Sequence, residues 1–492
     1  MKLLAVLLKI VFALLALLIL LVGGLLLLMP GIHVSSIDMI LNVMAGKGED
    51  SPDEKLLDRL RVSNGYQVSV FARGITNPRM LALDDSGNLL VSSPRSGEVV
   101  LLGDRDGDGA ADQQETVLSG LQRPHGIALH DGYLYVAESH QVGRTPYTAE
   151  GGVSGDYQVI AGGFTDEGNH WSKTIAFDAT GKLYIAMGST CNVCEELDPR
   201  RATIMRFNSD GSDGRIYASG LRNSVGMAFA PWNGRLYATD NGRDLLGDDY
   251  PPCELNQIAE DGFYGWPYLN GANEKDPDFG ELRPELQAQA IAPIFDFPAH
   301  NAPLGIHFPD DGSKSALVAL HGSWNRSQPD GYKVVRLQWR EQGDIHSEDF
   351  MWGFEQDADI IGRPVDVSSD GRGGFFISDD YARVIYRVSP RANLASASAS
   401  ASASASASAR GQLQESIGPS LALAGGTLYD AMPCGECHDA EAATPVLLRE
   451  LPQRYTLQSL ADYFQTPTPP MPLYDLNAEQ RQQLAHYLFS QE

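Results

Sequence analysis

Basic residues and cysteines are both scarce in this chain. Its 492 residues include 37 Lys and Arg against 63 Asp and Glu, so the formal net charge is −26. This charge argues against binding to nucleic acid or to an anionic membrane surface, because both would repel the protein. Five cysteines are few for a secreted protein. Apolar residues make up 43% of the chain, enough for a sizeable core, and the length predicts about two to four domains.

An uninterrupted apolar run occupies residues 10–29, after Lys2 and Lys9. As a helix it would span roughly 30 Å, the thickness of a bilayer core. No small-x-small cleavage site follows the run, and the lysines predict that this end stays in the cytoplasm. We therefore expect residues 1–30 to be an uncleaved transmembrane anchor in a bacterial inner membrane. Residues 31–60 would form a stem, and the rest of the chain would lie in the periplasm.

A hairpin pattern recurs six times in the central part of the chain. Each copy has an apolar strand, a Gly/Asp turn, and a second strand of alternating β-branched and aromatic residues. The copies start at Asn77, Arg123, His170, Asn223, Pro303 and Arg363. Their spacing is close to the length of a propeller blade plus insertions. Six four-stranded blades closed in a ring leave only short edges, so residues 61–392 are predicted to form an all-β six-bladed β-propeller.

Residues 393–411 include a strict alternation of Ala and Ser. Such a sequence cannot form a core and is typical of a flexible linker. We expect it to connect the propeller to a separate C-terminal domain, residues 412–492.

That domain contains the run CGECH, with Cys434, Cys437 and His438. C-x-x-C-H is the attachment signature of a c-type haem. The two thiols would form thioethers to the haem, and His438 would bind the iron. Met471, in a proline-flanked loop, is the expected second axial ligand. A zinc knuckle or a local disulfide is the alternative, but no second Cys/His pair follows at zinc spacing.

Residues 412–492 as a whole resemble a small class I cytochrome c. The resemblance implies an all-α domain whose last helix packs an aromatic side chain against the first helix, near paired small residues. Tyr487 and the pair Gly425-Gly426 occupy the matching places.

The other cysteines are Cys191, Cys194 and Cys253. Cys191 and Cys194 have redox-motif spacing without a thioredoxin-like setting, so we favour a structural disulfide among the three, with one thiol left over. A redox-active or metal-binding pair is the alternative. Residues 104–115 fit the spacing of an EF-hand calcium loop. Their flanks read as strands, which instead favours an acidic turn.

Several turns carry recognisable motifs in the same order as a known family. These are GNHWSKTIAFDATGKLYIAMG (168–188), GLRNSVG (220–226), TDNGRD, PPCELN and YGWP (within 239–267), and HGSWNRSQPDGYKVVR (321–336). Together they resemble the quinoprotein sugar dehydrogenases that use pyrroloquinoline quinone (PQQ), namely the soluble glucose and sorbosone dehydrogenase group. The resemblance covers residues 75–392.

The resemblance implies roles for individual residues. His170 matches the family's general base, and an imidazole can take a proton from a sugar hydroxyl near neutral pH. Arg222 and Asn223 match the LRN motif that binds PQQ, Arg363 matches an arginine in a G-R-P stretch, and Arg326 is a looser match. Guanidinium groups suit a planar molecule with three carboxylates.

The family also holds a Ca²⁺ ion that polarises the quinone, partly through two successive backbone carbonyls. These positions fall on Gly242 and Arg243. Cys253 stands where the family pattern has an acidic residue, which puts a second ion at this loop in doubt.

These observations predict a membrane-anchored, PQQ- and Ca²⁺-dependent sugar dehydrogenase acting on an aldose or a sorbosone-like sugar aldehyde. Electrons would pass from PQQ to the chain's own haem c and then to a respiratory acceptor. A lactonase-like metal hydrolase propeller is one alternative. A non-catalytic binding propeller fused to an electron-transfer cytochrome is another.

Overall fold

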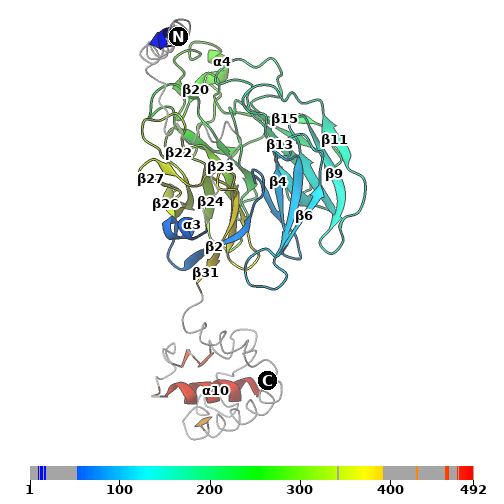
Figure 1. Cartoon of the computed structure of the whole chain (residues 1–492), viewed down its shortest axis with the longest axis vertical. Helices are drawn as coiled ribbons and strands as arrows, with labels where there is room; N and C mark the ends of the chain where they lie inside the picture. The colour runs from blue at the N-terminus through cyan, green and yellow to red at the C-terminus, as the bar shows by residue number, and fades with distance from the viewer. Residues whose placement is uncertain are drawn as a thin grey trace, which may run out of the picture. The chain divides into compact units, whose positions relative to one another are not determined.

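The computed structural model describes residues 9, 12–14, 16–17, 53–340, 343–391, 428–429, 460–461, 463–464, 474 and 476–490. The chain divides into two compact units, residues 1–391 and 392–492, and each is described by itself (Figure 1). In the described ranges no helix is both long and apolar enough to cross a membrane. The predicted anchor over residues 10–29 lies largely outside the described residues.

The first unit is built from six antiparallel sheets of four main strands. The innermost strands are β3 (Leu81–Leu83), β7 (Ile127–His130), β12 (Lys173–Phe177), β16 (Met227–Phe229), β23 (Pro303–His307) and β29 (Pro364–Ser369). Each contacts the innermost strands of its two neighbours, and β29 contacts β3, so the six strands close a ring. This confirms the predicted six-bladed β-propeller.

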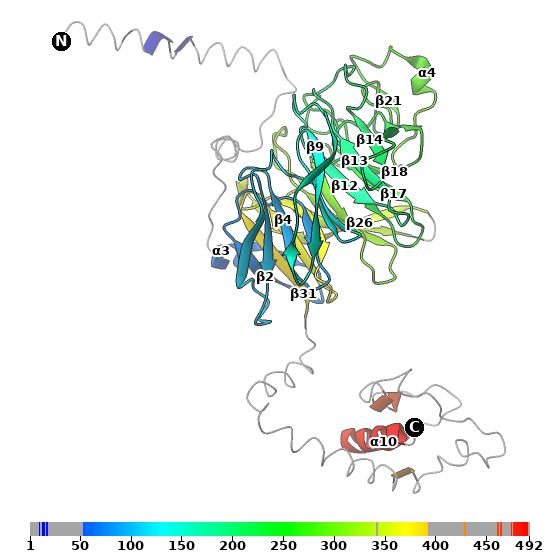
Figure 2. The same ribbon diagram turned by 90° about the vertical axis from the view of Figure 1, so that its right-hand side faces the viewer.

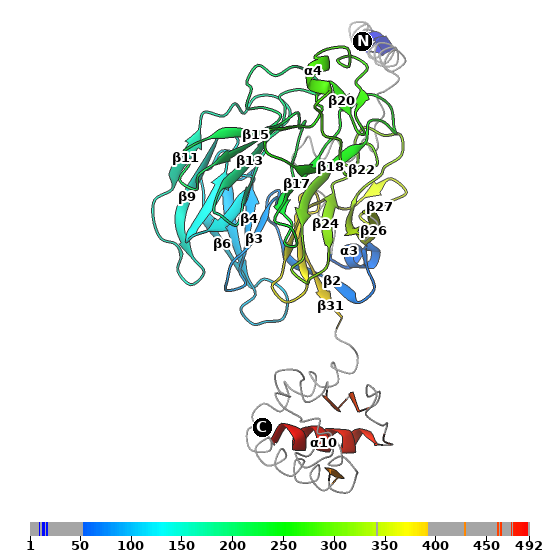
Figure 3. The ribbon, with the colours of Figure 1, turned by 180° about the vertical axis from the view of Figure 1, so that it is seen from behind.

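The second strands of the blades are β4 (Leu89–Ser93), β8 (Tyr133–Ala137), β13 (Leu183–Met187), β17 (Leu236–Asp240), β24 (Ser315–Leu320) and β30 (Phe375–Asp379). The third are β5 (Glu98–Gly103), β9 (Gln141–Thr148), β14 (Thr203–Phe207), β18 (Cys253–Ile258), β25 (Lys333–Trp339) and β31 (Val384–Pro390). The outermost are β6 (Gln113–Leu118), β11 (Gln158–Gly162), β15 (Arg215–Ser219), β22 (Phe295–Phe297), β26 (Ile345–Trp352) and β2 (Tyr66–Arg73). Figures 2 and 3 show these strands from two further directions.

Short elements complete the unit. They are β1 (Arg61–Val62), β10 (Gly152–Val153), β19 (Gly262–Phe263), β20 (Leu269–Asn270), β21 (Glu274–Lys275), β27 (Glu355–Gln356), β28 (Asp359–Ile360), α3 (Asp53–Arg59) and α4 (Pro284–Gln287). The helix α3 falls within the predicted stem. Leu56 and Leu60 are an i, i+4 apolar pair buried against the propeller, so this part of the stem packs as propeller structure.

The ring is closed by a strand from the beginning of the propeller sequence. β2 pairs antiparallel with β31, with Tyr66 opposite Pro390 and Arg73 opposite Val384. All three ribbon views show β2, β31 and α3 side by side. The last blade is therefore assembled from both ends of the propeller sequence.

Apolar side chains fill the space between neighbouring blades. Six buried clusters lie one at each of the six blade interfaces. Strands such as β4, β13 and β24 are buried along their whole length because both faces of a blade pack against another blade. Continuous burial on both faces explains why these strands read as apolar runs.

The described part of the second unit centres on α10 (Ala478–Ser490). Leu484, Ala485 and Leu488 of this helix are buried in a cluster with Leu460, Ala461 and Phe464. The ring of Tyr487 lies 5.4 Å from that of Tyr429, centroid to centroid. The predicted haem residues Cys434, Cys437, His438 and Met471 lie outside the described residues, as do Gly425, Gly426 and the linker.

Candidate functional site at one end of the channel

Three of the predicted site residues stand just before innermost strands. His170 precedes β12, Arg222 precedes β16 and Arg363 precedes β29. The innermost strands run in the same sense around the ring, so their starts lie at one end of the central channel. The loops after β13, β17 and β24 reach the same end, because each second strand is antiparallel to the innermost strand.

His170 is half-buried and held through one ring nitrogen. Its Nδ1 lies 3.0 Å from the Ser189 carbonyl oxygen and 2.9 Å from Ser189 Oγ. A carbonyl oxygen only accepts, so Nδ1 carries the proton and Nε2 keeps its lone pair. Burial and then the charge of Arg222 lower the pKa of His170 to about 3, so the ring is neutral at pH 7. No hydrogen bond among the described residues reaches Nε2.

Arg201 fixes the backbone around this histidine. The buried guanidinium donates to the carbonyls of His170 and Ser189, each at 2.9 Å, and to the Thr165 carbonyl at 2.7 Å. Lys173 is also buried and donates to the carbonyls of Thr165 and Trp171. Burial and the neighbouring Arg201 lower the pKa of Lys173 to about 7. Neither cation forms an ion pair with any residue that the structure describes.

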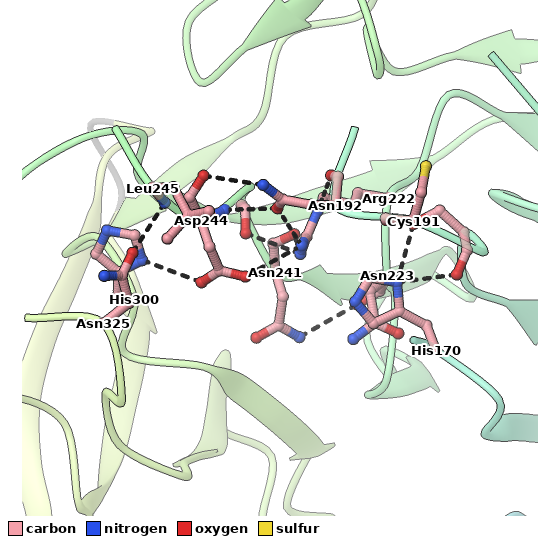
Figure 4. A network of polar contacts seen from close by, with 12 residues as sticks. His170, Cys191, Asn192, Arg222, Asn223, Asn241, Asp244, Leu245, His300 and Asn325 are labelled. Carbon is pink, nitrogen blue, oxygen red and sulfur yellow. Dashed lines mark hydrogen bonds and ion pairs between the residues drawn. The ribbon is translucent and has the colours of Figure 1, made fainter. Parts of the chain in front are cut away.

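Arg222 is buried with all five of its N–H groups donated to protein acceptors (Figure 4). Nε donates to the Asn192 carbonyl at 2.8 Å, and Nη1 to the carbonyls of Asn241 at 3.1 Å and Gly242 at 2.8 Å. Nη2 donates to Asn192 Oδ1 at 2.9 Å and to Asp244 Oδ2 at 3.3 Å. The ion pair with Asp244 is the longest of the five contacts.

The LRN turn itself is held by a buried carboxylate at the end of β17. Asp240 accepts the backbone N–H of Arg222 at 2.8 Å and that of Asn223 at 2.6 Å. Burial raises the pKa of Asp240 to about 7. Asn223 also lies next to His170, because a Cβ on Gly188 would come within 2.6 Å of Asn223 Oδ1 and 2.7 Å of His170 Cβ. Only glycine at position 188 lets these two side chains approach.

The other two predicted arginines contact different loops. Arg363 is buried and donates to the carbonyls of His321 and Gly322, each at 3.0 Å. Arg326 donates to the Asp248 carbonyl at 2.6 Å and pairs with Asp249 at 3.0 Å. The structure thus places Arg326 on the 248–249 loop, while His170, Arg222 and Asn223 come together.

The two carbonyls predicted to bind Ca²⁺ differ in their contacts. Gly242 O already accepts Arg222 Nη1, whereas no hydrogen bond in the described part of the chain ends on Arg243 O. The Arg243 side chain is turned to Asp276, with both carboxylate oxygens at 2.8 Å. A carbonyl has a second lone pair, and the Asp244 carboxylate follows directly. The oxygen donors at this turn therefore fit a hard cation.

The disulfide prediction is confirmed. Cys191 pairs with Cys194, and Cys253 is a buried free thiol. The acidic residues Asp104, Asp106 and Asp108 lie between the strands β5 and β6, with their carboxylates within 4.8 Å of one another. Their oxygens accept backbone N–H groups of the same turn.

Several residues of the site were missed by motif reasoning. Asn192 and Asp244 contact Arg222. His300 contacts Asp244, with 3.5 Å between Nδ1 and the carboxylate. Its Nε2 lies 2.8 Å from the Gly247 carbonyl oxygen. At the other side of the channel Asp380 pairs with Arg79 at 2.7 Å and with His321 at 2.8 Å. Asp244 and Asp380 fall within the quoted motif region or repeat, but only the fold shows their partners.

Comparisons with known proteins agree with the fold. A family model described as TrAA12-like matches residues 60–261 and 285–391. An uncharacterised protein of Borreliella burgdorferi is 32% identical over 360 residues, which cover 68% of this chain and 92% of that protein. The pyrroloquinoline quinone-dependent pyranose dehydrogenase of Coprinopsis cinerea is 27% identical over 328 residues, 56% of this chain and 44% of that protein.

This chain therefore spans less than half the length of the Coprinopsis enzyme. Among solved structures, the calcium structure of a Trichoderma reesei carbohydrate-active enzyme of family AA12 aligns with a TM-score of 0.60 at 21% identity. The alignment covers 70% of this chain and 99% of that chain. At that identity the likeness shows a shared fold.

Proposed function

The chain belongs to the TrAA12-like family, whose model matches most of its propeller, and from this membership we propose that it is a PQQ-dependent sugar dehydrogenase. One observation carries the proposal. A neutral histidine with an available ring nitrogen lies beside buried cations at one end of the channel. A general base next to a site for an anionic cofactor is what sugar oxidation by a quinone requires.

The charges around His170 fit a molecule with several carboxylates. The guanidinium groups of Arg201 and Arg222 are buried there, together with Lys173, whose pKa of about 7 leaves it partly charged at neutral pH. Of these three residues only Arg222 has a described carboxylate within ion-pair distance, that of Asp244. A surplus of buried positive charge is costly in a chain that is acidic overall, unless an anion compensates it. This surplus supports PQQ, which carries three carboxylates, as the bound group.

Arg222 is the first residue that we expect to hold PQQ. Four of its N–H groups donate to carbonyl or amide oxygens, and the fifth faces Asp244 at the longest distance. A cofactor carboxylate would replace that Asp244 contact with the least disturbance. Asn223, beside His170, is the second residue, and Arg363 and Arg326 complete the proposed set.

His170 would act as the general base. Its Nδ1–H is fixed by Ser189, so Nε2 can accept the proton of a substrate hydroxyl. Bound PQQ would supply the two-electron acceptor for the carbon that carries this hydroxyl. A nearby anionic cofactor would raise the pKa of His170 towards neutrality, because it offsets the charge of Arg222.

A Ca²⁺ ion is proposed at the turn that contains Gly242 and Arg243. The Arg243 carbonyl, the second lone pair of the Gly242 carbonyl and the Asp244 carboxylate are suitable oxygen donors. The calcium structure of the Trichoderma relative supports this choice of metal.

The remaining parts of the proposal rest on sequence. Cys434, Cys437, His438 and Met471 would hold a haem c that takes electrons from the propeller site and passes them to a respiratory acceptor. The apolar run at residues 10–29 would anchor the chain, with both other domains in the periplasm. The substrate would be a sugar or a sugar aldehyde.

The proposal is tested with the full chain purified without PQQ. PQQ and CaCl₂ are added, followed by a panel of aldoses, oligosaccharides and sorbosone. Reduction of an artificial acceptor is measured, and reduction of the haem is followed through its absorption bands. We expect sugar-dependent reduction that needs PQQ. Lactone hydrolysis without PQQ would instead support the hydrolase alternative, and no PQQ binding at all would contradict the proposal.

A further inference from the structure

Asn192 joins two loops that come from different blades. Its Oδ1 accepts from Arg222 Nη2 at 2.9 Å and from the Asp244 backbone N–H at 2.8 Å. Its Nδ2 donates to the Asp244 carbonyl at 3.0 Å, and its own carbonyl accepts from Arg222 Nε at 2.8 Å. One half-buried side chain thus connects the loop after β13 to the turn after β17 (Figure 4).

The Cys191–Cys194 disulfide closes the loop that carries Asn192. The loop is fastened further by Glu196, which accepts the Thr190 backbone N–H at 2.6 Å and the Thr190 hydroxyl at 2.8 Å. Gly168 has a φ of +82°, and a Cβ there would lie 2.1 Å from Thr190 O, so this approach requires glycine. Holding the loop in advance reduces the conformational entropy that Asn192 must lose to make its contacts.

These contacts determine the orientation of Arg222. Two of its five N–H groups end on Asn192 and two on the Asn241 and Gly242 carbonyls. A buried guanidinium needs all its donors satisfied, and without the Asn192 side chain Nη2 would keep only its 3.3 Å contact with Asp244, so the side chain should move. Arg222 is in turn the largest charged influence on His170 after burial.

We propose that Asn192 is a positioning residue, held by the Cys191–Cys194 ring, that fixes Arg222 and the Asp244 turn without touching the substrate. The disulfide orders the loop that carries Asn192, and the Asn192 side-chain amide then holds the Asp244 turn of the next blade through its hydrogen bonds. The effect on turnover rests on the proposed function, whereas the contacts themselves do not.

The contacts are tested by amide hydrogen exchange on the full chain without added ligand. Asn192→Ala removes the acceptor of the Asp244 N–H, so we expect the amides of residues 241–249 other than Leu245 to exchange faster, and the Asp244 amide most of all. The Leu245 N–H donates to Asn325 Oδ1 at 2.8 Å and should stay protected, which makes it an internal reference.

Asn208→Ala is the matched control. Asn208 is also half-buried, and its side chain makes two hydrogen bonds, with Ser212 and Lys182, against three for Asn192. It follows the opposite end of β14 from Asn192. Asn192→Asp keeps both acceptor contacts but sets a carboxylate oxygen against the Asp244 carbonyl in place of the Nδ2 donor, so it should restore part of the protection. If Asn192→Ala exchanges like Asn208→Ala over residues 241–249, the inference is wrong.

The role of the disulfide is tested with Cys191→Ser/Cys194→Ser, which should raise exchange over residues 189–196 and, to a smaller extent, over 241–249.

With PQQ and CaCl₂ present, we expect Asn192→Ala to lower kcat by about 10-fold with little change in KM, and Asn192→Asp to recover part of the lost kcat. A wild-type chain that binds no PQQ would overturn the proposed function alone, because the exchange result still decides the inference. Normal exchange in both variants would overturn the inference alone.

Discussion

His170 and His125 both stand shortly before the innermost strand of neighbouring blades, yet their surroundings give them different chemistry. Each precedes the innermost strand of its blade, and each has a pKa lowered to about 3 by burial and then by an arginine, Arg222 or Arg79. His125 donates from Nδ1 to the Lys173 carbonyl at 3.2 Å, and its Nε2 lies 3.4 Å from Arg79 Nη2. Its lone pair is therefore directed at a protein donor.

His170 differs in one respect: no described residue donates to its Nε2. An available lone pair on Nε2, rather than a lowered pKa, therefore separates a candidate base from a structural histidine. His125 is fully buried and packs edge-on against Trp171 at 6.0 Å, which fits a role in holding the channel wall.

The largest expected difference between the two histidines is in turnover. His170→Ala should lower kcat/KM by about 10²–10⁴-fold, because it would remove the proposed proton acceptor. His125→Ala should lower it by less than about 10-fold, because it changes packing, one contact of Arg79 and one donor to the Lys173 carbonyl, none of which is at His170. Steady-state kinetics of the PQQ-loaded chain measures both. Equal losses of kcat/KM in the two variants would show that His170 is no more a base than His125.

Replacing the arginine beside His170 should affect both rate and pH dependence. Arg222→Gln removes the positive charge that helps to lower the pKa of His170. That pKa should rise, so the protonated and inactive form appears at higher pH and the acid limb of kcat/KM moves up. We also expect kcat to fall by about 100-fold through lost positioning. An unmoved acid limb would show that Arg222 does not act on His170.

For the free energy of unfolding we expect the opposite ranking, with the larger loss in His125→Ala. His125→Ala leaves a cavity beside Trp171 and removes one of the two donors to the Lys173 carbonyl, the other being the Gly126 N–H at 2.9 Å. Together these losses should cost about 3 kcal/mol. His170→Ala empties a half-buried position and should cost about 1 kcal/mol. Urea unfolding of the two variants gives the comparison directly. A larger loss for His170→Ala would mean that His170 is the structural residue.

The last expected effect is on the stability of the fold in acid. The unfolded chain protonates a histidine near its ordinary pKa of 6.5, whereas folded His125 does so only near pH 3. The unfolded state therefore binds more protons between these values, and the free energy of unfolding falls as pH drops below 6.5. His125→Gln should make that fall shallower. Unfolding midpoints measured from pH 7 to pH 4 in both proteins test this.

The fold was largely predictable because each blade begins with a local hairpin. The alternating patterns that start at Asn77, Arg123 and the later copies predicted all six blades, since apolar strands joined by short Gly/Asp turns pair readily with each other as hairpins. The packing of Leu56 and Leu60 was not predicted, because these residues pack against the last two blades, which are far from α3 in sequence.

The site was predictable where a motif names the residue and not where a loop supplies it. His170, Arg222 and Asn223 were predicted from their motifs, and the structure brings them together, while their roles stay predictions. Asn192 was missed because an asparagine in a loop carries no signal of its own. Its contacts with Arg222 and Asp244 appear only when two blades are placed side by side.

The pairing of β2 with β31 has a consequence for how the protein is made. Tyr66 leaves the ribosome more than three hundred residues before its partner Pro390. During synthesis the first strand must wait, with its edge unpaired, until the end of the last blade emerges. Five blades can assemble in order as they appear, but the ring seals only at this final, long-range step.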